Sequence, residues 1–351
     1  MDMRRITVMT SFVVSAGVTG IGGDEGRIPL FTVTTINQPG YYIVTRDIAS
    51  ASSTTIIIQS SNVTVDLNGH TLSAPAAANV IGLTGGANTG VTIRNGRILN
   101  GARGVGGGGG GTPLSLRVEG VEIANSSDAG ISIDGAAVSV DVIGCHIHNV
   151  ASDGIHVSNS TADFRGRFLD NTIEDVGGNG LNLFGLRGGE VRRNVVLNHG
   201  SSLPNAAGIL LSGVASSEAG GNIVEDNTVN AVVGVNDEDG IRIEPGSQNN
   251  LIVGNVVRRN GRFGIWSQAS EARLERNLAD HSGGSGFEVG NGASGARNHL
   301  EANQAQANGG CGINFENLNT HAYRNNIVRS NTGGGICNGA APNTDAGGNI
   351  L

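Results

Sequence analysis

Apolar residues recur two positions apart at many points along this chain, directly after a glycine, as in Gly154-Ile155-His156-Val157. A spacing of two is the period of a β-strand, in which alternate side chains point to opposite faces. The glycine–apolar pair returns at intervals of 22 to 32 residues. It occurs at Gly130-Ile131, Gly154-Ile155, Gly180-Leu181, Gly208-Ile209, Gly240-Ile241, Gly264-Ile265, Gly286-Phe287, Gly312-Ile313 and Gly335-Ile336. The pattern predicts one short strand at the same place in each of a series of repeats.

A second column of residues has the same period. It consists of an apolar residue, two spacers and an asparagine, and it runs through Asn171, Asn194, Asn227, Asn255, Asn277, Asn303 and Asn326. Two columns with one period are typical of a coil that stacks on the next at roughly 4.8 Å, each strand pairing with its counterpart. The asparagines would then form a ladder of buried amides, and the glycines would supply a turn conformation that other residues resist. We expect an all-β fold, a parallel β-helix of about eleven coils, in which residues 23–351 form a single domain.

The first part of the chain carries a resemblance to a known family. The stretches GYYIVTRDI (40–48), TTIIIQSSNVTVDLNGHTLSA (54–74) and GVTIRNGRI (90–98) look like the usual opening coils of such solenoids. Over residues 30–351 the sequence resembles the right-handed parallel β-helix superfamily, which includes pectate lyases, polygalacturonases and alginate-modifying enzymes. The resemblance implies a right-handed helix and a polysaccharide ligand.

Composition narrows the classes of function. The chain has 351 residues, 58 of them glycine, and a net charge of −8, with all basic charge on arginine. An acidic protein lacks the basic surface that nucleic-acid binding needs. The absence of lysine excludes a lyase that uses a lysine base. Cys145, Cys311 and Cys337 have neither a disulfide framework nor metal spacing, so we expect buried, small apolar side chains there.

The two ends of the chain suggest location and assembly. Arg4 and Arg5 precede an apolar run from Ile6 to Val18, which is the order of a secretory signal, so residues 1–22 are interpreted as a signal peptide or a disordered tail. A secreted or cell-surface protein without a membrane span is therefore expected. The segment 346–350 repeats 219–223, which begins a new strand. An incomplete last coil predicts a homo-oligomer through the C-terminal coil.

If the glycine–apolar pair marks one strand per coil, the residue after the apolar one points outward. That column contains Ser132, His156, Asn182, Leu210, Arg242, Trp266, Glu288, Asn314 and Cys337. Arg242, Trp266 and Glu288 then lie in one line in adjacent coils. Trp266 is the only tryptophan in the chain, and sugar rings stack on such side chains.

This line is the first predicted site. Arg242 could hold a carboxylate or act as a base, and Glu244 or Glu288 could accept a proton. Asn182, Asn314 and Asp239 are further candidates for binding the substrate. The longest repeats end at Gly208 and Gly240, and insertions on one face of a solenoid usually mark its binding face.

The sequence DEDGIRIEPG (237–246) opens the Arg242 strand with three acids. Asp237 and Asp239 could bind a Ca²⁺ ion, which prefers carboxylate oxygens. The alternative is that the acids solvate a turn. No other cofactor is predicted.

The sequence ASDGIHVSNS (151–160) carries a second candidate site at Asp153 and His156. The stretch resembles the polygalacturonase motif whose Asp is catalytic. The following coil, however, has Gly177-Gly178-Asn179 where those enzymes have an acidic pair. Shared turn chemistry is the alternative explanation. His146, His148 and His156 also leave a metal trio open, without diagnostic spacing.

These residues favour a secreted polysaccharide-processing protein, a lyase or epimerase acting on an acidic polysaccharide. Two alternatives stay open. One is a non-catalytic, glycan-binding or adhesive surface protein, and the other is a glycoside hydrolase that uses Asp153.

Overall fold

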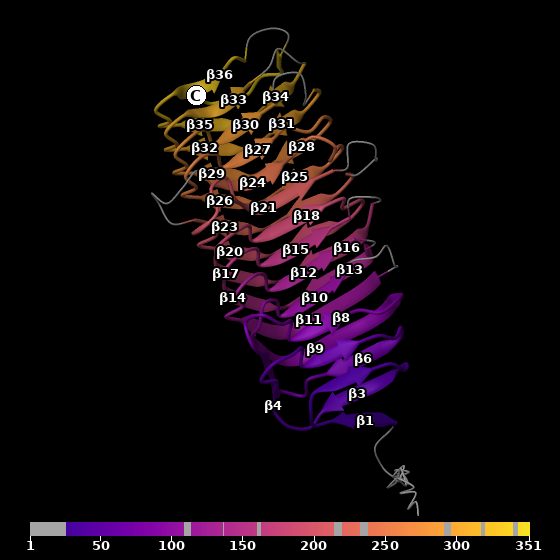
Figure 1. Cartoon of the computed structure of the whole chain (residues 1–351). Helices are drawn as coiled ribbons and strands as arrows, with labels where there is room; N and C mark the ends of the chain where they lie inside the picture. Colours follow the sequence, from indigo (N-terminus) through magenta and orange to yellow (C-terminus); the bar gives the residue numbers. More distant parts are fainter. Residues whose placement is uncertain are drawn as a thin grey trace, which may run out of the picture.

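The computed structural model describes residues 26–351, except 109–113, 136, 160–162, 214–219, 232–237, 291–295, 317–319 and 340–342. All the regular secondary structure in this part of the chain is β-strand, and all the strand pairs are parallel. The strands stack into one elongated solenoid that runs from the N-terminal to the C-terminal coil (Figure 1). The predicted parallel β-helix is confirmed. Among the described residues there is no helix with the length and apolar character needed to cross a membrane.

One strand per coil forms a 13-stranded sheet, which we call the first face. Its strands are β2 (Thr34–Ile36), β5 (Ile56–Ile58), β8 (Ile81–Leu83), β10 (Val105–Gly108), β12 (Ile131–Asp134), β15 (Ile155–Ser158), β18 (Leu181–Phe184), β21 (Ala207–Ser212), β24 (Asp239–Ile243), β27 (Ile265–Ser267), β30 (Phe287–Val289), β33 (Cys311–Phe315) and β36 (Gly334–Cys337). With one strand per coil, these thirteen strands are close to the predicted number of about eleven coils.

The remaining strands form a 24-stranded sheet that folds into two further faces. The second face contains β1 (Arg27–Leu30), β3 (Gly40–Val44), β6 (Val63–Asp66), β9 (Asn88–Asn100), β11 (Leu114–Ala124), β13 (Ala137–Ile143), β16 (Arg165–Leu169), β19 (Glu190–Arg192), β22 (Ile223–Glu225), β25 (Leu251–Val253), β28 (Arg273–Glu275), β31 (His299–Glu301), β34 (Ala322–Arg324) and β37 (Thr344–Asp345). The third face contains β4 (Ile48–Ala49), β7 (Thr71–Ala74), β14 (His146–Val150), β17 (Thr172–Val176), β20 (Val195–Leu197), β23 (Thr228–Asn230), β26 (Val256–Arg258), β29 (Leu278–Asp280), β32 (Gln304–Gln306) and β35 (Ile327–Arg329). The long strands β9 and β11 pair with strands of both faces and join them.

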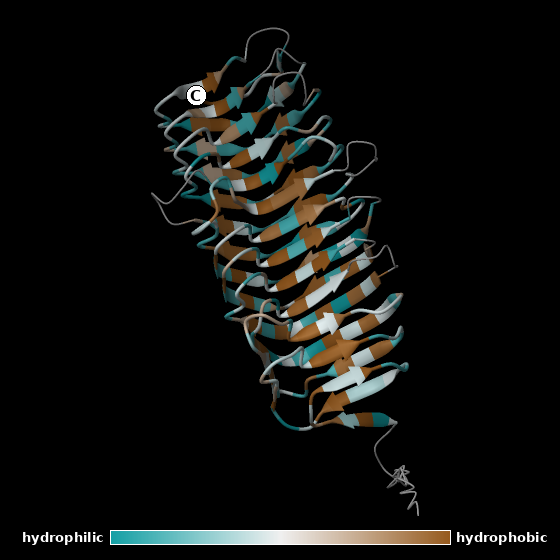
Figure 2. Ribbon diagram, in the orientation of Figure 1, coloured by the Kyte–Doolittle hydropathy of each residue, from teal (hydrophilic) through white to brown (hydrophobic). Residues whose placement is uncertain are grey.

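The core is a set of stacked apolar columns inside the solenoid. Ile131, Ile155, Leu181, Ile209 and Ile241 are Cα partners in successive strands of the first face, and none is exposed to solvent. Apolar and polar positions alternate along the strands (Figure 2). This agrees with the two-residue period of the sequence, because one side of each strand faces the core.

The repeated glycines have a different role from the one predicted. Gly154 does not have a positive φ, so it supplies no left-handed turn. A Cβ atom at this position would lie 2.6 Å from the Ile173 side chain and 2.8 Å from the carbonyl oxygen of Gly180. Glycine is therefore needed because the chain passes too close to the core and to the next coil for any side chain.

The asparagine column is confirmed as a ladder at the turn between the second and third faces. From Asn171 to Asn326, each side-chain amide donates to Oδ1 of the next asparagine at 2.9–3.1 Å, and Asn349 accepts the last of these bonds. Each amide also donates to a backbone carbonyl of the preceding coil, as Asn194 does to Phe168 at 2.8 Å. The buried polar groups of the turn are thus satisfied. Sequence analysis missed a second, shorter ladder between Asn308 and Asn331.

The prediction for the cysteines is correct for Cys145 and wrong for the other two. Cys145 is buried and free. Cys311 and Cys337 form a disulfide between β33 and β36, with Cα atoms 6.1 Å apart. They lie in adjacent coils, and a repeat brings into contact residues that are distant in sequence. Residues 1–22 lie outside the described part, and association through the C-terminal coil stays a prediction.

Candidate functional site

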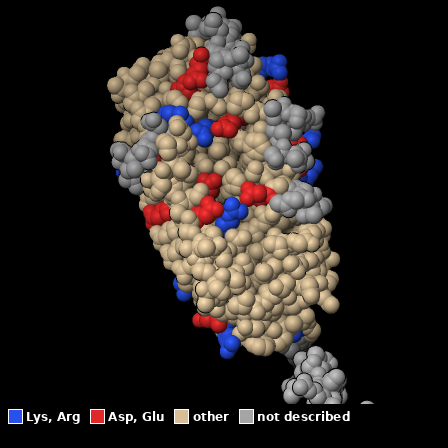
Figure 3. Space-filling view, viewed as in Figure 1, with Lys and Arg blue, Asp and Glu red and all other residues tan. Residues whose placement is uncertain are grey.

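The outward column predicted from the sequence is present on the first face. The Cα partners run through Ser132, His156, Asn182, Leu210, Arg242, Trp266, Glu288, Asn314 and Cys337. Figure 3 shows acidic and arginine side chains in two groups on this face, one over β10–β15 and the other over β24–β30. The sequence pattern favours the second group as the site.

Both groups contain the same local motif, Asp-Gly-Ile followed by a basic residue. In each, the aspartate directly precedes the glycine–apolar pair and the basic residue follows it at the outward position. His156 Nδ1 lies 3.2 Å from Asp153 Oδ2, and Arg242 Nη1 lies 3.3 Å from Asp239 Oδ2. Asp239, one of the acids of the 237–246 stretch, therefore pairs with Arg242 in the same way as Asp153 pairs with His156.

Asp239 is the centre of what we call the distal cluster, which consists of Asp239, Arg242, Arg262, Phe263 and Trp266. The Asp239 side chain has no exposed surface. Arg262 binds it through Nε at 2.9 Å and Nη2 at 2.5 Å, and the backbone N–H of Phe263 donates to it at 3.3 Å. Burial raises the pKa of Asp239, and Arg262 and Arg242 oppose this effect.

This environment argues against the predicted roles of Asp239 as a calcium ligand or a direct contact to substrate. A carboxylate that holds two guanidinium groups and has no exposed surface is already neutralised. Asp237 lies outside the described residues.

Arg242 and Trp266 lie side by side as predicted, but both make contacts within the protein. The Arg242 side chain is only 11% exposed. It donates to the carbonyl oxygen of Asn205 at 2.9 Å, and its Nε lies 3.3 Å from Glu244 without hydrogen-bond geometry. The Arg262 guanidinium lies 4.6 Å from the centre of the Trp266 ring and covers one of its faces. Trp266 is half-buried rather than a fully exposed plate.

Glu288 is buried beside this cluster, with 2% of its surface exposed. Asn314 Nδ2 donates to its Oε1 at 2.6 Å, and burial raises the pKa of Glu288 to about 7. Glu316, whose pKa is also raised by burial, shares a hydrogen bond with it. Glu288 can thus exchange a proton near neutral pH, but in this conformation its carboxyl group is out of reach of a substrate.

The first charged group, in contrast, surrounds an open cavity of about 220 Å³. Its charged and polar lining comes from three successive coils and consists of Arg103, Asp128, Ser132, Asp134, Ser152, Asp153 and His156. We call it the His156 cavity.

Asp153 is held rigidly at one side of this cavity. Its Oδ1 accepts from the Asn179 backbone at 2.7 Å and from the Asn179 side chain at 2.9 Å. Its Oδ2 accepts from Asn182 at 2.9 Å and lies 3.2 Å from His156 Nδ1. Burial acts to raise the pKa of Asp153, but these bonds outweigh it and the pKa is lowered. Asn182 thus helps to position Asp153, and its contact with a substrate stays a prediction.

His156 bridges two carboxylates. Its Nδ1 faces Asp153, and its Nε2 lies 3.2 Å from Asp134 Oδ1. Asp134 and then Asp153 raise the pKa of His156 to about 9, against the effect of burial. The imidazole is therefore a cation at neutral pH, and its side chain is 27% exposed.

Sequence analysis did not assign a role to the other charged residues of the cavity, Arg103, Asp128 and Asp134. Arg103 binds Asp128 through Nε at 2.8 Å and Asp134 through Nη1 at 3.1 Å. The signal was present, because Arg103-Gly104-Val105 is one more glycine–apolar pair, and Arg103 stands where Asp153 stands two coils later. The three glycines that follow Val105 in β10 interrupt the two-residue alternation of apolar side chains, so this strand was not recognised.

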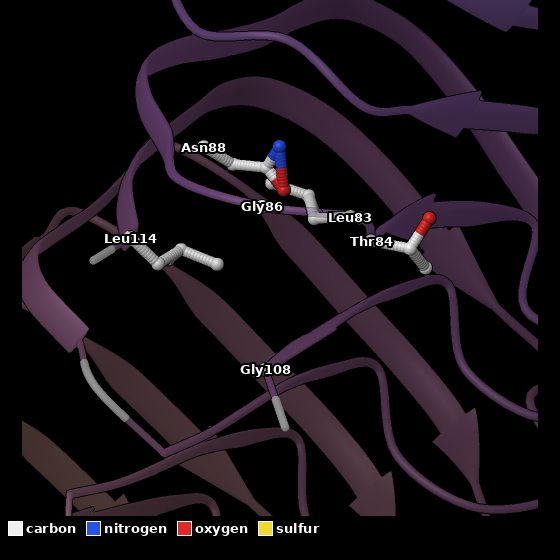
Figure 4. Close-up of a pocket in the computed structure, with 7 residues that line it drawn as sticks. Leu83, Thr84, Gly86, Asn88, Gly108 and Leu114 are labelled. Atoms are coloured by element: carbon white, nitrogen blue, oxygen red, sulfur yellow. The ribbon is translucent and has the colours of Figure 1, made fainter. Parts of the chain in front are cut away.

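The other candidates do not form sites. His146 and His148 stack at 4.5 Å on the third face, whereas His156 is on the first, so the three cannot share a metal ion. Glu275, His299 and Glu301 lie within 4.8 Å of one another, but Arg273 and Arg324 bind the two glutamates at 2.6 and 2.8 Å. A pocket beside β8, lined by Asn88 and Leu114, measures about 20 Å³ and has room for about one water (Figure 4).

The charge of His156 gives a first prediction. A titration of the histidine signals by NMR should give His156 a pKa of about 9, and Asp134→Asn should lower it towards 6.5. Because the folded pKa is the higher one, the contribution to stability is complete below pH 6.5 and is lost as the pH rises through about 9. A wild-type pKa near 6.5 would show that His156 does not bridge the two carboxylates.

Comparison with known proteins places the fold in a family. A family model described as "Right handed beta helix region" matches residues 35–198, 129–299 and 212–351. The chain belongs to this family. The predicted right-handed solenoid is thereby confirmed. No curated protein sequence matches the chain significantly.

Solved structures of this fold include several proteins that are similar to the chain. The A-module of the mannuronan C-5 epimerase AlgE4 from Azotobacter vinelandii has a TM-score of 0.70 at 12% identity, over 88% of this chain and 91% of that one. The catalytic unit of a GH87 α-1,3-glucanase from Streptomyces thermodiastaticus has a TM-score of 0.53 at 16% identity, and the match covers 93% of this chain and 62% of that one. The Dettilon tailspike protein has a TM-score of 0.52 at 15% identity, and the match covers 83% of this chain and 62% of that one. At these identities the likeness shows the fold alone.

Proposed function

We propose that the protein is a secreted polysaccharide-modifying enzyme of the lyase or epimerase type. It binds a uronate-containing chain along the first face and acts on one sugar unit in the His156 cavity. The observation that carries the proposal is this cavity, in which two cations and three carboxylates from three coils line one open space. Convergence of ionisable groups in a cavity, with the pKa values of Asp134, Asp153 and His156 shifted by their neighbours, is typical of catalytic sites.

Two cations in the cavity suit the reaction. Removing the proton beside a uronate carboxylate places negative charge on that group, so fixed cations must lie next to it. Arg103 and His156 supply them, and His156 keeps its charge because its pKa is about 9. They are positioned by the surrounding aspartates before the substrate arrives.

Asp134 is the proton acceptor in this proposal. Its side chain is 45% exposed, so a substrate can reach it. Hydrogen bonding by His156 is the main cause that lowers the pKa of Asp134, and the group is therefore ionised at neutral pH. Asp153 does not touch the substrate; it orients His156.

The same pKa values disfavour the hydrolase alternative. A glycoside hydrolase needs one carboxylic acid that is still protonated at its working pH. Asp153 and Asp134 both have lowered pKa values, so neither carries a proton near neutrality. His156 does carry a proton, but it is an imidazolium whose raised pKa keeps it charged, and it is not the carboxylic acid that such a hydrolase uses.

The fold and the chain terminus add support. A parallel β-helix is the scaffold of a mannuronan epimerase and of a glucanase, so polysaccharide chemistry is compatible with it. Export is supported by the arginine pair and apolar run of residues 4–18.

The test is turnover of a panel of uronate-containing and neutral polysaccharides. Ultraviolet absorbance detects unsaturated chain ends, NMR detects inversion at C5, and a reducing-sugar assay detects hydrolysis. We expect one uronate polymer to be eliminated or epimerised, and Asp134→Asn to slow turnover by about 100-fold.

Asp170→Asn is the matched control. Asp170 is an exposed aspartate in the turn that follows β16, bound to Arg193, and its φ of 58° suits asparagine equally well. It should keep wild-type activity. New reducing ends without unsaturation would indicate the hydrolase alternative, and tight binding without turnover would indicate a non-catalytic glycan-binding protein.

A further inference from the structure

The distal cluster lies on the same face as the His156 cavity and in the same outward column. Four pairing steps separate His156 from Trp266, through Asn182, Leu210 and Arg242. At roughly 4.8 Å per step, the two lie ~19 Å apart along the solenoid axis. This distance exceeds the size of one sugar unit, so only an oligomer can contact both.

The distal cluster is built as a rigid surface. The buried Asp239 carboxylate fixes Arg262 with two hydrogen bonds, and the Arg262 guanidinium in turn lies over the Trp266 ring. Phe263 packs edge-on against the same ring at 5.3 Å. Groups that are already ordered lose little entropy when a ligand binds.

The chemistry of this surface matches a sugar chain. Trp266 is half-buried and Arg262 retains 24% of its side-chain exposure, so both reach solvent. Aromatic rings contact the apolar faces of sugars, and guanidinium groups bind hydroxyl and carboxylate oxygens. Glu244 and Asp239 both pair with Arg242, which is only 11% exposed, so Arg262, at 24% exposure, is the cation that an acidic sugar would meet.

We propose that the distal cluster is a second binding site for the same acidic polysaccharide, which must therefore span both sites. The inference rests on the proposed function of the His156 cavity. It adds that the natural substrate is a chain of several sugar units rather than a short oligosaccharide.

The test compares a trisaccharide with an octasaccharide of the polymer that the wild type turns over. Wild type should have a KM at least about tenfold lower for the octasaccharide. Trp266→Ala should raise that KM by about fivefold to tenfold, leave kcat unchanged, and leave the trisaccharide unaffected, since a lost aromatic contact costs on the order of 1 kcal/mol.

Phe31→Ala is the matched control, because Phe31 is an exposed aromatic residue near the first coil, remote from both sites. It should behave as wild type does. Equal KM values for the two oligosaccharides in the wild type would overturn the second site even if Trp266→Ala failed to fold. That result would leave the His156 cavity intact, whereas failure of wild type to turn over or bind any polysaccharide would overturn both proposals.

Discussion

Replacing Asn303 with alanine is expected to lower the free energy of unfolding by about 3 kcal/mol or more. Asn303 is fully buried in the middle of the ladder. Its amide donates to Leu274 O at 2.8 Å and to Asn326 at 3.1 Å, and its Oδ1 accepts from the backbone and side chain of Asn277, both at 3.0 Å. Alanine leaves these partners without a bond and without water, and each buried orphan costs ~1–3 kcal/mol.

Gln304→Ala provides the comparison for this experiment. Gln304 is the next residue in the chain and is exposed at the start of β32. Its replacement should change stability by less than ~0.5 kcal/mol. Denaturant unfolding followed by circular dichroism measures both variants, and equal stabilities would mean that the ladder does not hold adjacent coils together.

Replacing His156 with glutamine is expected to reduce turnover of the polysaccharide by at least about 100-fold. Glutamine can still bond to one aspartate, but it brings no charge to neutralise the substrate carboxylate, and the loss of one such group costs ~10²–10³ in rate. The loss should appear in kcat, because the charge develops in the transition state.

His281→Gln is the matched control for this variant. His281 is an exposed histidine that also contacts an aspartate, Asp280, at 2.6 Å, but it lies beside the third face. It should retain full activity. If both histidine variants kept wild-type kcat, the His156 cavity would not be the site of the chemistry.

The fold could be predicted from the sequence because the same pattern of glycine, apolar residue and asparagine recurs in repeat after repeat. The asparagine and glycine–apolar columns each fixed one strand boundary per coil, and the predicted neighbours in the outward column were all found. The glycine explanation failed, since a sequence shows which residue is small but not what approaches it. The Cys311–Cys337 disulfide was missed for the related reason that only one pair of coils carries it.

The candidate site was predicted only in part. Sequence reasoning placed Arg242, Trp266 and Glu288 side by side, but it could not show that Arg262 would cover Trp266 or that Glu288 would be buried. Asp153 and His156 are weak candidates from the sequence, because a single acid in a turn is common. Their significance depends on Arg103 and Asp134 in the neighbouring coils, which only the stacking of the coils brings together.

A crystal structure of Asp134→Asn with an octasaccharide of the substrate tests the central claim most directly, because slow turnover should preserve the bound chain. We predict a sugar unit in the His156 cavity, with its carboxylate in contact with Arg103 and His156 and the chain running along the first face. A chain bound to the second or third face, with no sugar in the cavity, would contradict this account.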